Sequence, residues 1–344
     1  MGSALDAATA TGETTIIDGY VPIIDIAAAL AGTPIARRTV AGAIEKAATT
    51  SGFFVITGHG VVPELVERME RVSLEFFGLP TEIKQRYATE PGDPTIRGWY
   101  GTSSYVSGSE DVETAPDLCE LYTISRLGEP GVATHESLGD DFDVWSRPNP
   151  WPSEIPEFRA TWLEYYAALE GVADELMRFF ALALELDEQF FDDKFDDHIT
   201  NLVVNHYPPV EDEPVPGQWR KGPHSDWGTM TILYQDGTGG LEVFDRDADE
   251  WMTVPVVAGS FVVNIGDLME VWTNDRWRSS KHRVPVPPPE VRSRSRISVP
   301  FFHQPSWSVE VACLESCLGP DEVPVHQPVG SGAYLLEKIR TAYS

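Results

Sequence analysis

Cysteine, positive charge and long apolar runs are all scarce in this chain of 344 residues. Its 3 cysteines are too few for a disulfide framework, and their scarcity is typical of a protein kept in a reducing cytoplasm, where we expect this one. Lys and Arg number 25 against 54 Asp and Glu, so the formal charge of −29 argues against binding to nucleic acid or to an anionic membrane surface. No apolar run approaches the roughly 18 residues that span a bilayer. Residues 1–15 also lack a basic region followed by an apolar stretch, so we expect no secretory signal.

Hydrophobic residues make up 42% of the chain and charged residues 23%, which is typical of a globular protein. Apolar residues at helical spacing predict four helices, over residues 34–51, 63–77, 158–186 and 332–343. Apolar runs predict early strands over 21–26 and 53–60. After about residue 199, short β-rich runs alternate with turn residues, which predicts an all-β sandwich or barrel.

These patterns divide the chain without a clear linker. We expect a flexible tail over residues 1–15, a helical and β region over 16–125, and a helix followed by the β core over 126–344. The last two regions form one continuous catalytic unit in this interpretation. The fold class is therefore mainly β with helices at both ends of the chain.

The segment GPHSDWGTMTILYQD, residues 222–236, carries a candidate metal site. His224 and Asp226 are two residues apart, so on a strand their side chains point to the same face. His282 lies in a later β-like run and is the candidate third ligand. Two histidines and one carboxylate on one face of a metal are the arrangement of non-haem Fe(II) oxygenases, while a zinc hydrolase is the main competitor for the same ligand types.

A candidate carboxylate receptor follows the metal segment. Arg296 and Ser298 are also two residues apart, and a guanidinium beside a hydroxyl offers a carboxylate several donors at once. Residues 276–296 hold seven basic residues and one acidic residue in an otherwise acidic chain. This local charge indicates an anionic ligand near His282. Arg296 is the strongest candidate because it begins an apolar strand, where an unpaired charge is costly.

Several motifs, in order along the chain, carry a family resemblance over about residues 20–342. The chain resembles the Fe(II)- and 2-oxoglutarate-dependent dioxygenases of the isopenicillin N synthase-like group. The matching motifs are VPIIDI (21–26), GFFVITGHGV (52–61), FFGLP (76–80), NHYPP (205–209), HSDWG (224–228), GLEV (240–243), FVVNIGD (261–267), KHRV (281–284) and RIS (296–298).

The resemblance implies a double-stranded β-helix (jelly-roll) core flanked by N-terminal and C-terminal helices. It implies that His224, Asp226 and His282 bind iron, with O2 and 2-oxoglutarate as cosubstrates. In such relatives the Arg and Ser of the RxS motif bind the distal carboxylate of 2-oxoglutarate, which here implies Arg296 and Ser298. The tyrosine of the NxY motif commonly donates to the same cosubstrate, which implies Tyr207 here.

Three further expectations belong to the same motifs and to the region where substrate binds. Asn205 shares a face with Tyr207, so it positions the cosubstrate or the metal-bound groups, or else only bonds to the backbone. Gly266 and Asp267 are interpreted as a tight turn. The family's variable pocket region covers residues 97–125, and its candidate substrate contacts are Arg97, Tyr100, Tyr105 and Tyr122.

The expected activity is oxidation, by default hydroxylation, of an unactivated C–H bond in a small organic molecule, with release of succinate and CO2. The composition suits a bacterial enzyme of secondary metabolism, such as antibiotic biosynthesis. A carboxylate at Asp226 speaks against halogenation, because halogenating relatives lack that ligand. Two alternatives stay open: an isopenicillin N synthase-type oxidase or cyclase that does not use 2-oxoglutarate, and a non-catalytic jelly-roll binding protein. The sequence does not indicate the oligomeric state.

Overall fold

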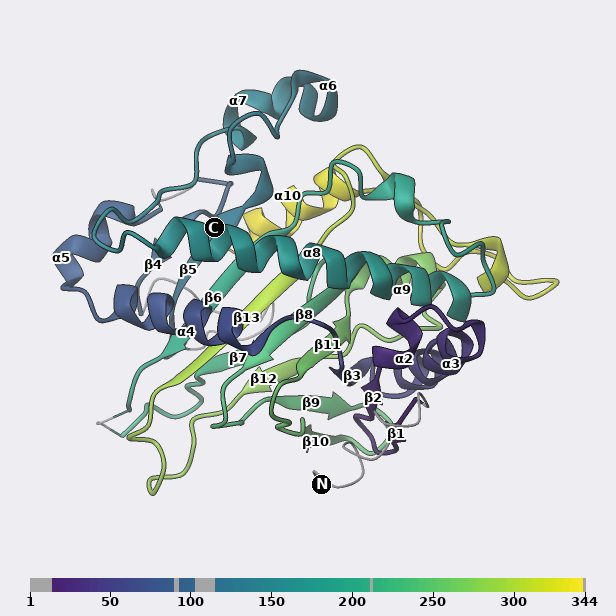
Figure 1. The fold of residues 1–344 in the computed structure, drawn as a ribbon, viewed down its shortest axis with the longest axis horizontal. Coiled ribbons are helices and arrows are strands. Elements are labelled where there is room, and N and C mark those ends of the chain that lie inside the picture. The colour runs from purple at the N-terminus through teal and green to yellow at the C-terminus, as the bar shows by residue number, and fades with distance from the viewer. Residues whose placement is uncertain (1–13, 90–92, 103–114, 211–212, 343–344) are drawn as a thin grey trace.

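A computed structural model describes residues 14–89, 93–102, 115–210 and 213–342 of the chain (Figure 1). Most of the expected N-terminal tail falls outside this part. The first half contains β1 (Ile16–Ile17), β2 (Ile23–Asp25), α2 (Ala27–Leu30), α3 (Pro34–Thr50), β3 (Phe53–Thr57), α4 (Pro63–Phe77), α5 (Thr81–Lys84), β4 (Gly98–Tyr100), β5 (Glu120–Ser125), α6 (His135–Leu138), α7 (Phe142–Trp145) and α8 (Phe158–Ala183).

The second half consists mainly of strands, as the sequence predicted. It contains β6 (Asn201–Tyr207), β7 (Lys221–His224), β8 (Met230–Gln235), β9 (Glu242–Asp245), β10 (Glu250–Thr253), β11 (Phe261–Ile265), α9 (Asp267–Trp272), β12 (His282–Val284), β13 (Arg296–His303), β14 (Glu310–Val311), β15 (Val329–Gly330) and α10 (Ser331–Ala342).

Strands β6 to β13 form a jelly roll. The large sheet has the order β1-β2-β3-β11-β8-β13-β6-β5-β4, and the small sheet has the order β10-β9-β12-β7. From β6 to β9 the chain passes from one sheet to the other at every step, and it does so again from β10 to β13. This alternation builds two facing sheets, and the predicted double-stranded β-helix fold is confirmed.

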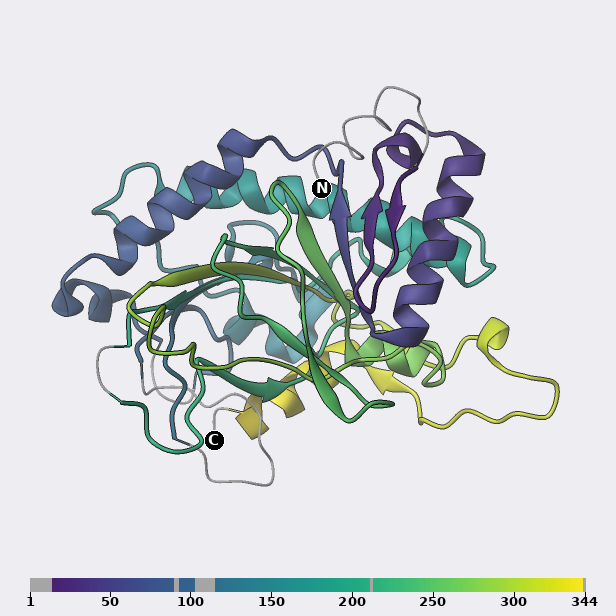
Figure 2. The same cartoon turned by 90° about the horizontal axis from the view of Figure 1, so that it is seen from below.

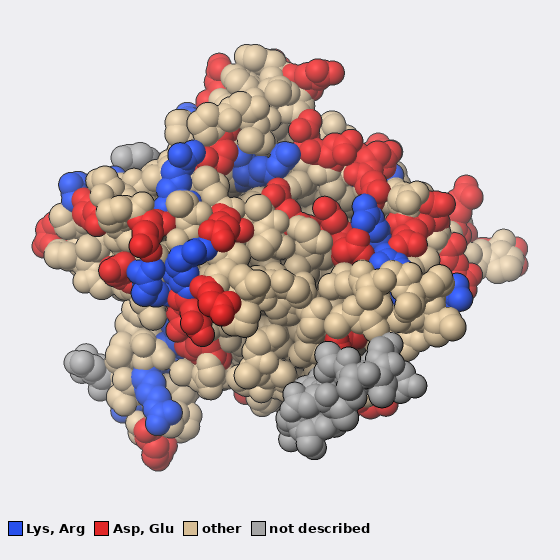
Figure 3. Space-filling model, in the orientation of Figure 1, with Lys and Arg blue, Asp and Glu red and all other residues tan. Residues whose placement is uncertain are grey.

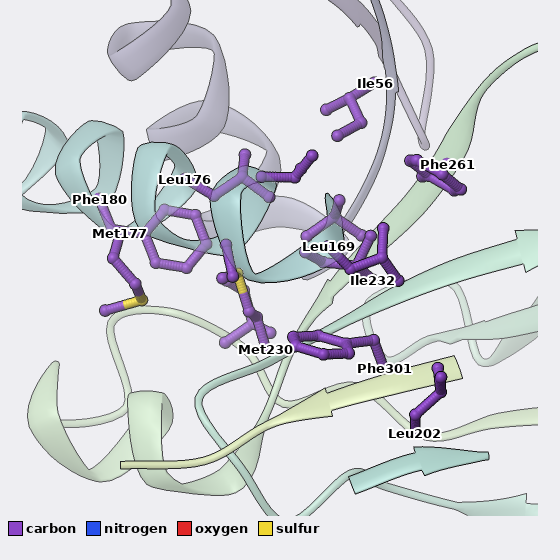
Figure 4. Close-up of a cluster of buried hydrophobic side chains, with 14 of the residues drawn as sticks. Ile56, Leu169, Leu176, Met177, Phe180, Leu202, Met230, Ile232, Phe261 and Phe301 are labelled. Carbon is purple, nitrogen blue, oxygen red and sulfur yellow. The ribbon is translucent and has the colours of Figure 1, made fainter. Parts of the chain in front are cut away.

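The helices cover the outer face of the large sheet. Helix α8 runs across that face, and α3 and α4 pack beside it (Figures 1 and 2). The predicted apolar stripe of α8 is buried, and Leu169 of this helix lies beside Ile232 from the sheet in Figure 4. Burial of such side chains removes apolar surface from water, which is the main favourable term in folding.

A second apolar cluster fills the space between the two sheets, and we call it the interior cluster. Its members come from both sheets and include Phe53, Val55, Cys119, Tyr207, Leu233, Leu241, Val243, Val262 and Val284. Successive strand residues point to opposite faces, so each strand of the large sheet contributes alternately to the interior cluster and to the core under the helices. The candidate site residues can therefore be assigned to one face or the other from the strand register.

The glycine that follows α3 is required by its surroundings. Gly52 follows α3 with a φ of +71°, and a Cβ there would lie 2.0 Å from the carbonyl oxygen of Arg278, so only glycine fits.

None of the helices in the described ranges is long and apolar enough to cross a membrane. Acidic side chains are spread over the face that carries α8, with basic side chains between them (Figure 3).

Candidate metal centre and carboxylate site

The three predicted metal ligands come together at one end of the small sheet. His282 of β12 lies directly opposite His224 of β7, and the centroids of their imidazole rings are 4.3 Å apart. Asp226 follows β7, with its Oδ1 3.9 Å from Nε2 of His224 and 3.6 Å from Nε2 of His282. The three ligand atoms lie within 4.8 Å of one another. Because ligand bonds to such metals are about 2.0–2.2 Å long, these separations fit one shared metal ion.

Backbone carbonyls orient both imidazole rings. Nδ1 of His224 lies 2.8 Å from the carbonyl oxygen of Gly222, and Nδ1 of His282 lies 3.2 Å from that of Ser280. A carbonyl oxygen only accepts, so each Nδ1 carries the hydrogen, and each Nε2 directs its lone pair toward the shared position.

The carboxylate of Asp226 is oriented by two side chains of the large sheet. The hydroxyl of Thr231 donates to Oδ2 at 2.5 Å, and the amide of Asn264 donates to the same oxygen at 2.7 Å. Thr231 on β8 and Asn264 on β11 are directly paired across the two strands, so they present their donors side by side. Oδ1 is then the carboxylate oxygen that faces the two histidines.

The surroundings favour the protonation states that a metal requires. Burial, together with the neighbouring His282, lowers the pKa of His224 to about 3. Burial alone would raise the pKa of Asp226, but His282, His224 and the donors Thr231 and Asn264 hold it below its ordinary value. At neutral pH the site therefore offers a neutral imidazole at His224 and an ionised carboxylate at Asp226, which are the metal-binding forms.

The candidate carboxylate receptor lies on the interior face of the large sheet. Arg296 is paired with Tyr207, and Ser298 with Asn205, across β13 and β6. Directly opposed residues share a face, so all four side chains point to the same side. All four are buried. Tyr207 and Ser298 share a hydrogen bond, and the Arg296 guanidinium lies 4.9 Å from the centre of the Tyr207 ring.

The Arg296 guanidinium has one nitrogen left for a ligand. Its Nε donates to the carbonyl oxygen of Gly239 at 2.7 Å, and Nη2 donates to Oε1 of Gln235 at 3.4 Å. Nη1 is buried, and in the part of the chain that the structure describes it has no hydrogen-bond partner. A buried donor without a partner is costly, and one on a charged group more so. These residues therefore fit a buried carboxylate ligand.

Comparisons with known proteins agree with this geometry. Residues 199–305 match the family model of the 2OG-Fe(II) oxygenase superfamily, where 2OG is 2-oxoglutarate, and residues 21–154 match the model of the non-haem dioxygenase in morphine synthesis N-terminal region. The chain is 37% identical to Validamycin A dioxygenase of Streptomyces hygroscopicus subsp. limoneus, over 92% of this chain and 82% of that protein. The chain belongs to the 2OG-Fe(II) oxygenase superfamily.

Further relatives of this oxygenase show the same chemistry and fold. It is 32% identical to the 2-oxoglutarate-Fe(II) type oxidoreductase hxnY of Emericella nidulans, over 90% of this chain and 86% of that protein. The crystal structure of a full-length Neurospora crassa protein in complex with alpha-KG, which is 2-oxoglutarate, and thymine has a TM-score of 0.82 at 27% identity, covering 95% of this chain and 99% of that one. The protein is thus an oxidoreductase of a family that uses Fe(II), 2-oxoglutarate and O2.

The structure corrects two of the four expected substrate contacts of the oxygenase. Tyr122 is 0% exposed and pairs with Val204, on the sheet face that packs against the helices; it contacts Phe158 and Trp162 there. Arg97 donates both terminal nitrogens to the backbone carbonyls of Trp145 and Arg147, so its guanidinium stabilises the chain around α7. Tyr122 therefore faces away from the interior, and the two terminal nitrogens of Arg97 are used by the backbone.

The other two expected contacts have different outcomes. Tyr100 is half-buried and is paired with Leu121, which is itself paired with Asn205, so Tyr100 lies on the interior face of the large sheet. Tyr100 stays a candidate substrate contact. Tyr105 lies outside the described residues.

Sequence reasoning missed several residues that shape the oxygenase site. Asn264 stands in the recognised motif FVVNIGD and Thr231 follows the HSDWG motif, but only the strand register shows that both reach Asp226. Gly266 and Asp267 were expected to form a tight turn. Instead, Gly266 precedes α9 and Asp267 begins it, and their N–H groups donate to the carbonyl oxygens of Thr229 and Asp226. The start of α9 therefore holds the loop that carries Asp226.

Proposed function

We propose that this oxygenase hydroxylates an unactivated C–H bond of a small organic molecule, with 2-oxoglutarate converted to succinate and CO2. The observation that carries the proposal is the combination of the clustered triad with the buried Nη1 of Arg296 on the interior face. The Fe(II) of this family, bound with 2-oxoglutarate and O2, supplies an oxidant strong enough to remove hydrogen from such a C–H bond.

In this proposal, one set of residues binds the metal and another set binds 2-oxoglutarate. His224, Asp226 and His282 would hold the Fe(II), which would supply the oxidising chemistry when 2-oxoglutarate and O2 are bound. Arg296, Ser298 and Tyr207 bind the distal carboxylate of 2-oxoglutarate, and Asn205 lies beside them. Burial of all four residues excludes water from that carboxylate and strengthens the contacts to it.

The proposed outcome of the reaction is hydroxylation rather than halogenation, because Asp226 is present as a carboxylate with one oxygen directed at the two histidines. Placement in the isopenicillin N synthase-like group rests on the motif order. A role in bacterial secondary metabolism is supported by the similarity to Validamycin A dioxygenase. The 3 cysteines are free, which suits a reducing cytoplasm.

The test measures O2 consumption and succinate formation with and without 2-oxoglutarate, using a panel of small organic molecules. We expect both to require 2-oxoglutarate, and we expect Asp226→Ala to abolish succinate formation coupled to oxidation. Oxidation that proceeds equally well without 2-oxoglutarate would instead support the isopenicillin N synthase-type oxidase. Near-normal turnover by Asp226→Ala would rule out its role as a ligand.

A further inference from the structure

A bulge in β7 turns Lys221 toward the interior of the jelly roll. His224 is paired with His282, and Lys221 is paired with Val284. Between these two pairs, β7 has two residues and β12 has one. The extra residue lies at Gly222–Pro223, and one extra residue moves the following side chain to the other face. Without this bulge Gly222 would face the interior and Lys221 would face outward.

The burial of Lys221 agrees with that register. Its pairing partner Val284 belongs to the interior cluster, and directly opposed residues share a face. Lys221 is only 9% exposed.

The charge of Lys221 also acts on two other buried groups of the interior cluster, Cys119 and Tyr207. Burial raises the pKa of the Cys119 thiol to about 11, and Lys221 is the strongest influence against that rise. Burial also raises the pKa of Tyr207, and the charges of Arg296 and Lys221 both oppose it.

The interior therefore holds two long cationic side chains, those of Lys221 and Arg296. Asp117 also lies at this end, where its Oδ1 accepts a hydrogen bond from the N–H of Gly222 at 3.1 Å. Arg296, Ser298 and Tyr207 already supply the donors that one carboxylate needs. Lys221 lies on the strand that also carries His224, and its ammonium is a strong donor for a second anionic group.

We propose that Lys221 binds a carboxylate inside the jelly roll, between the metal ligands and Arg296. The carboxylate belongs either to 2-oxoglutarate or to the molecule that is oxidised, and an ammonium recognises both through the same charge-assisted hydrogen bonds. The inference deepens the proposed function and rests on it, because the second source is the primary substrate of the same site. Lys221 is thus a binding residue that the RxS pair does not include.

Binding of 2-oxoglutarate is measured first, by calorimetry on the Fe(II)-loaded protein without O2. The variants are Lys221→Met, which keeps the side-chain length without the charge, and Lys221→Arg, which keeps the charge. Lys46→Met is the matched control, because Lys46 is exposed and forms a surface ion pair with Asp18 at 2.7 Å. If Lys221 contacts the cosubstrate, Lys221→Met weakens 2-oxoglutarate binding by about 10-fold or more, and Lys221→Arg restores part of it.

O2 consumption is measured second, with a panel of small carboxylic acids and their matching carboxamides. If Lys221 contacts the oxidised molecule, Lys221→Met binds 2-oxoglutarate normally but loses the preference for acids over amides. Lys221→Met that matches the wild type in both measurements would overturn the proposal, as would a wild type that neither binds 2-oxoglutarate nor responds to any acid. A different result would separate the two proposals. If the wild type consumes O2 with acids without needing 2-oxoglutarate, and Lys221→Met loses this response to acids, then the proposed function is contradicted and the role of Lys221 is retained.

Discussion

The two oxygens of the Asp226 carboxylate have different surroundings, and this difference explains how one side chain serves both the metal and the sheet. Oδ2 accepts from Thr231 and Asn264, while Oδ1 faces His224 and His282. Donors around a ligand fix its orientation, and their loss typically lowers metal affinity by about 10–100-fold. The cross-strand pair Thr231–Asn264 is thus part of the metal site without touching the metal.

Thr231→Val removes the hydroxyl and keeps the shape of the side chain. We expect Co(II) or Fe(II) affinity to fall by about 10-fold or more, because the carboxylate loses one of its two orienting donors. A titration followed by the absorption of Co(II) measures this directly. Thr231→Ser keeps the hydroxyl and is the control, for which affinity close to the wild type is expected. Equal affinity in Thr231→Val and Thr231→Ser would contradict the role given to the hydroxyl.

Tyr122 and Lys221 show where residue-level prediction from sequence ends. Tyr122 stands in β5, and the sheet face it occupies depends on the register with β6, which no single strand reveals. Lys221 faces inward because of a bulge in the same strand as His224. His224, Asp226, Arg296 and Ser298 were found because residue type and i, i+2 spacing suffice when the strand is regular or ends nearby.

At the scale of elements, helix α9 and the loop after β7 are joined through their backbones. The N–H groups of Asp267 and Leu268 donate to the carbonyl oxygens of Asp226 and Gly228 at 2.8 and 3.0 Å. This contact needs a close approach, since a Cβ on Gly266 would lie 2.3 Å from the carbonyl oxygen of Gly228. The position of the loop that carries Asp226 therefore depends on Gly266, which lies outside that loop.

Gly266→Ala should lower both the thermal stability and the metal affinity, because the new Cβ pushes the Gly228 backbone away from α9. Differential scanning calorimetry and metal titration measure the two effects. Gly42→Ala is the control: Gly42 lies within α3, and a Cβ there meets no atom within 4 Å. That change should stabilise the protein by about 0.5–1 kcal/mol, because alanine favours the helix. If Gly266→Ala left the metal affinity unchanged, the proposed link between the start of α9 and the metal ligand Asp226 would be contradicted.

The long elements were the easiest to predict. Helices α3, α4 and α8 follow from clear apolar periods, and their bounds agree within a few residues. Strands β4 and β5 were not predicted, because they lie in a segment rich in Gly, Ser and acidic residues that gives only a weak period. Their place at the edge of the large sheet comes from pairing with β6, which is a tertiary property.

At the scale of the whole molecule, strands from the N-terminal region extend the jelly roll on both sides. β3 pairs with β11 at one edge, and β5 pairs with β6 at the other, so a single large sheet includes residues from Ile16 to His303. A buried ion pair ties α5 to this sheet: Nζ of Lys84 lies 2.7 Å from Oε2 of Glu120. Trp99 and His206 also bond to Glu120, so the carboxylate has several partners.

Lys84→Met should destabilise the fold by about 3–5 kcal/mol, because removing one partner leaves Glu120 buried without its cation. Burial alone would raise the pKa of Glu120, but His206, Lys84 and Trp99 hold it below its ordinary value. The contribution of Glu120 is therefore present at neutral pH and is lost as the pH falls below about 4, the ordinary range of a glutamate. Urea unfolding at pH 7 and at low pH measures both effects. A Lys84→Met variant as stable as Lys46→Met at pH 7 would contradict this account.

A crystal structure grown without O2 in the presence of Fe(II) and 2-oxoglutarate tests the central claim most directly. We expect one iron within about 2.2 Å of Nε2 of His224, Oδ1 of Asp226 and Nε2 of His282. We also expect the distal carboxylate of 2-oxoglutarate within hydrogen-bond distance of Nη1 of Arg296. Iron bound elsewhere, or a 2-oxoglutarate carboxylate that does not reach Arg296, would contradict the account.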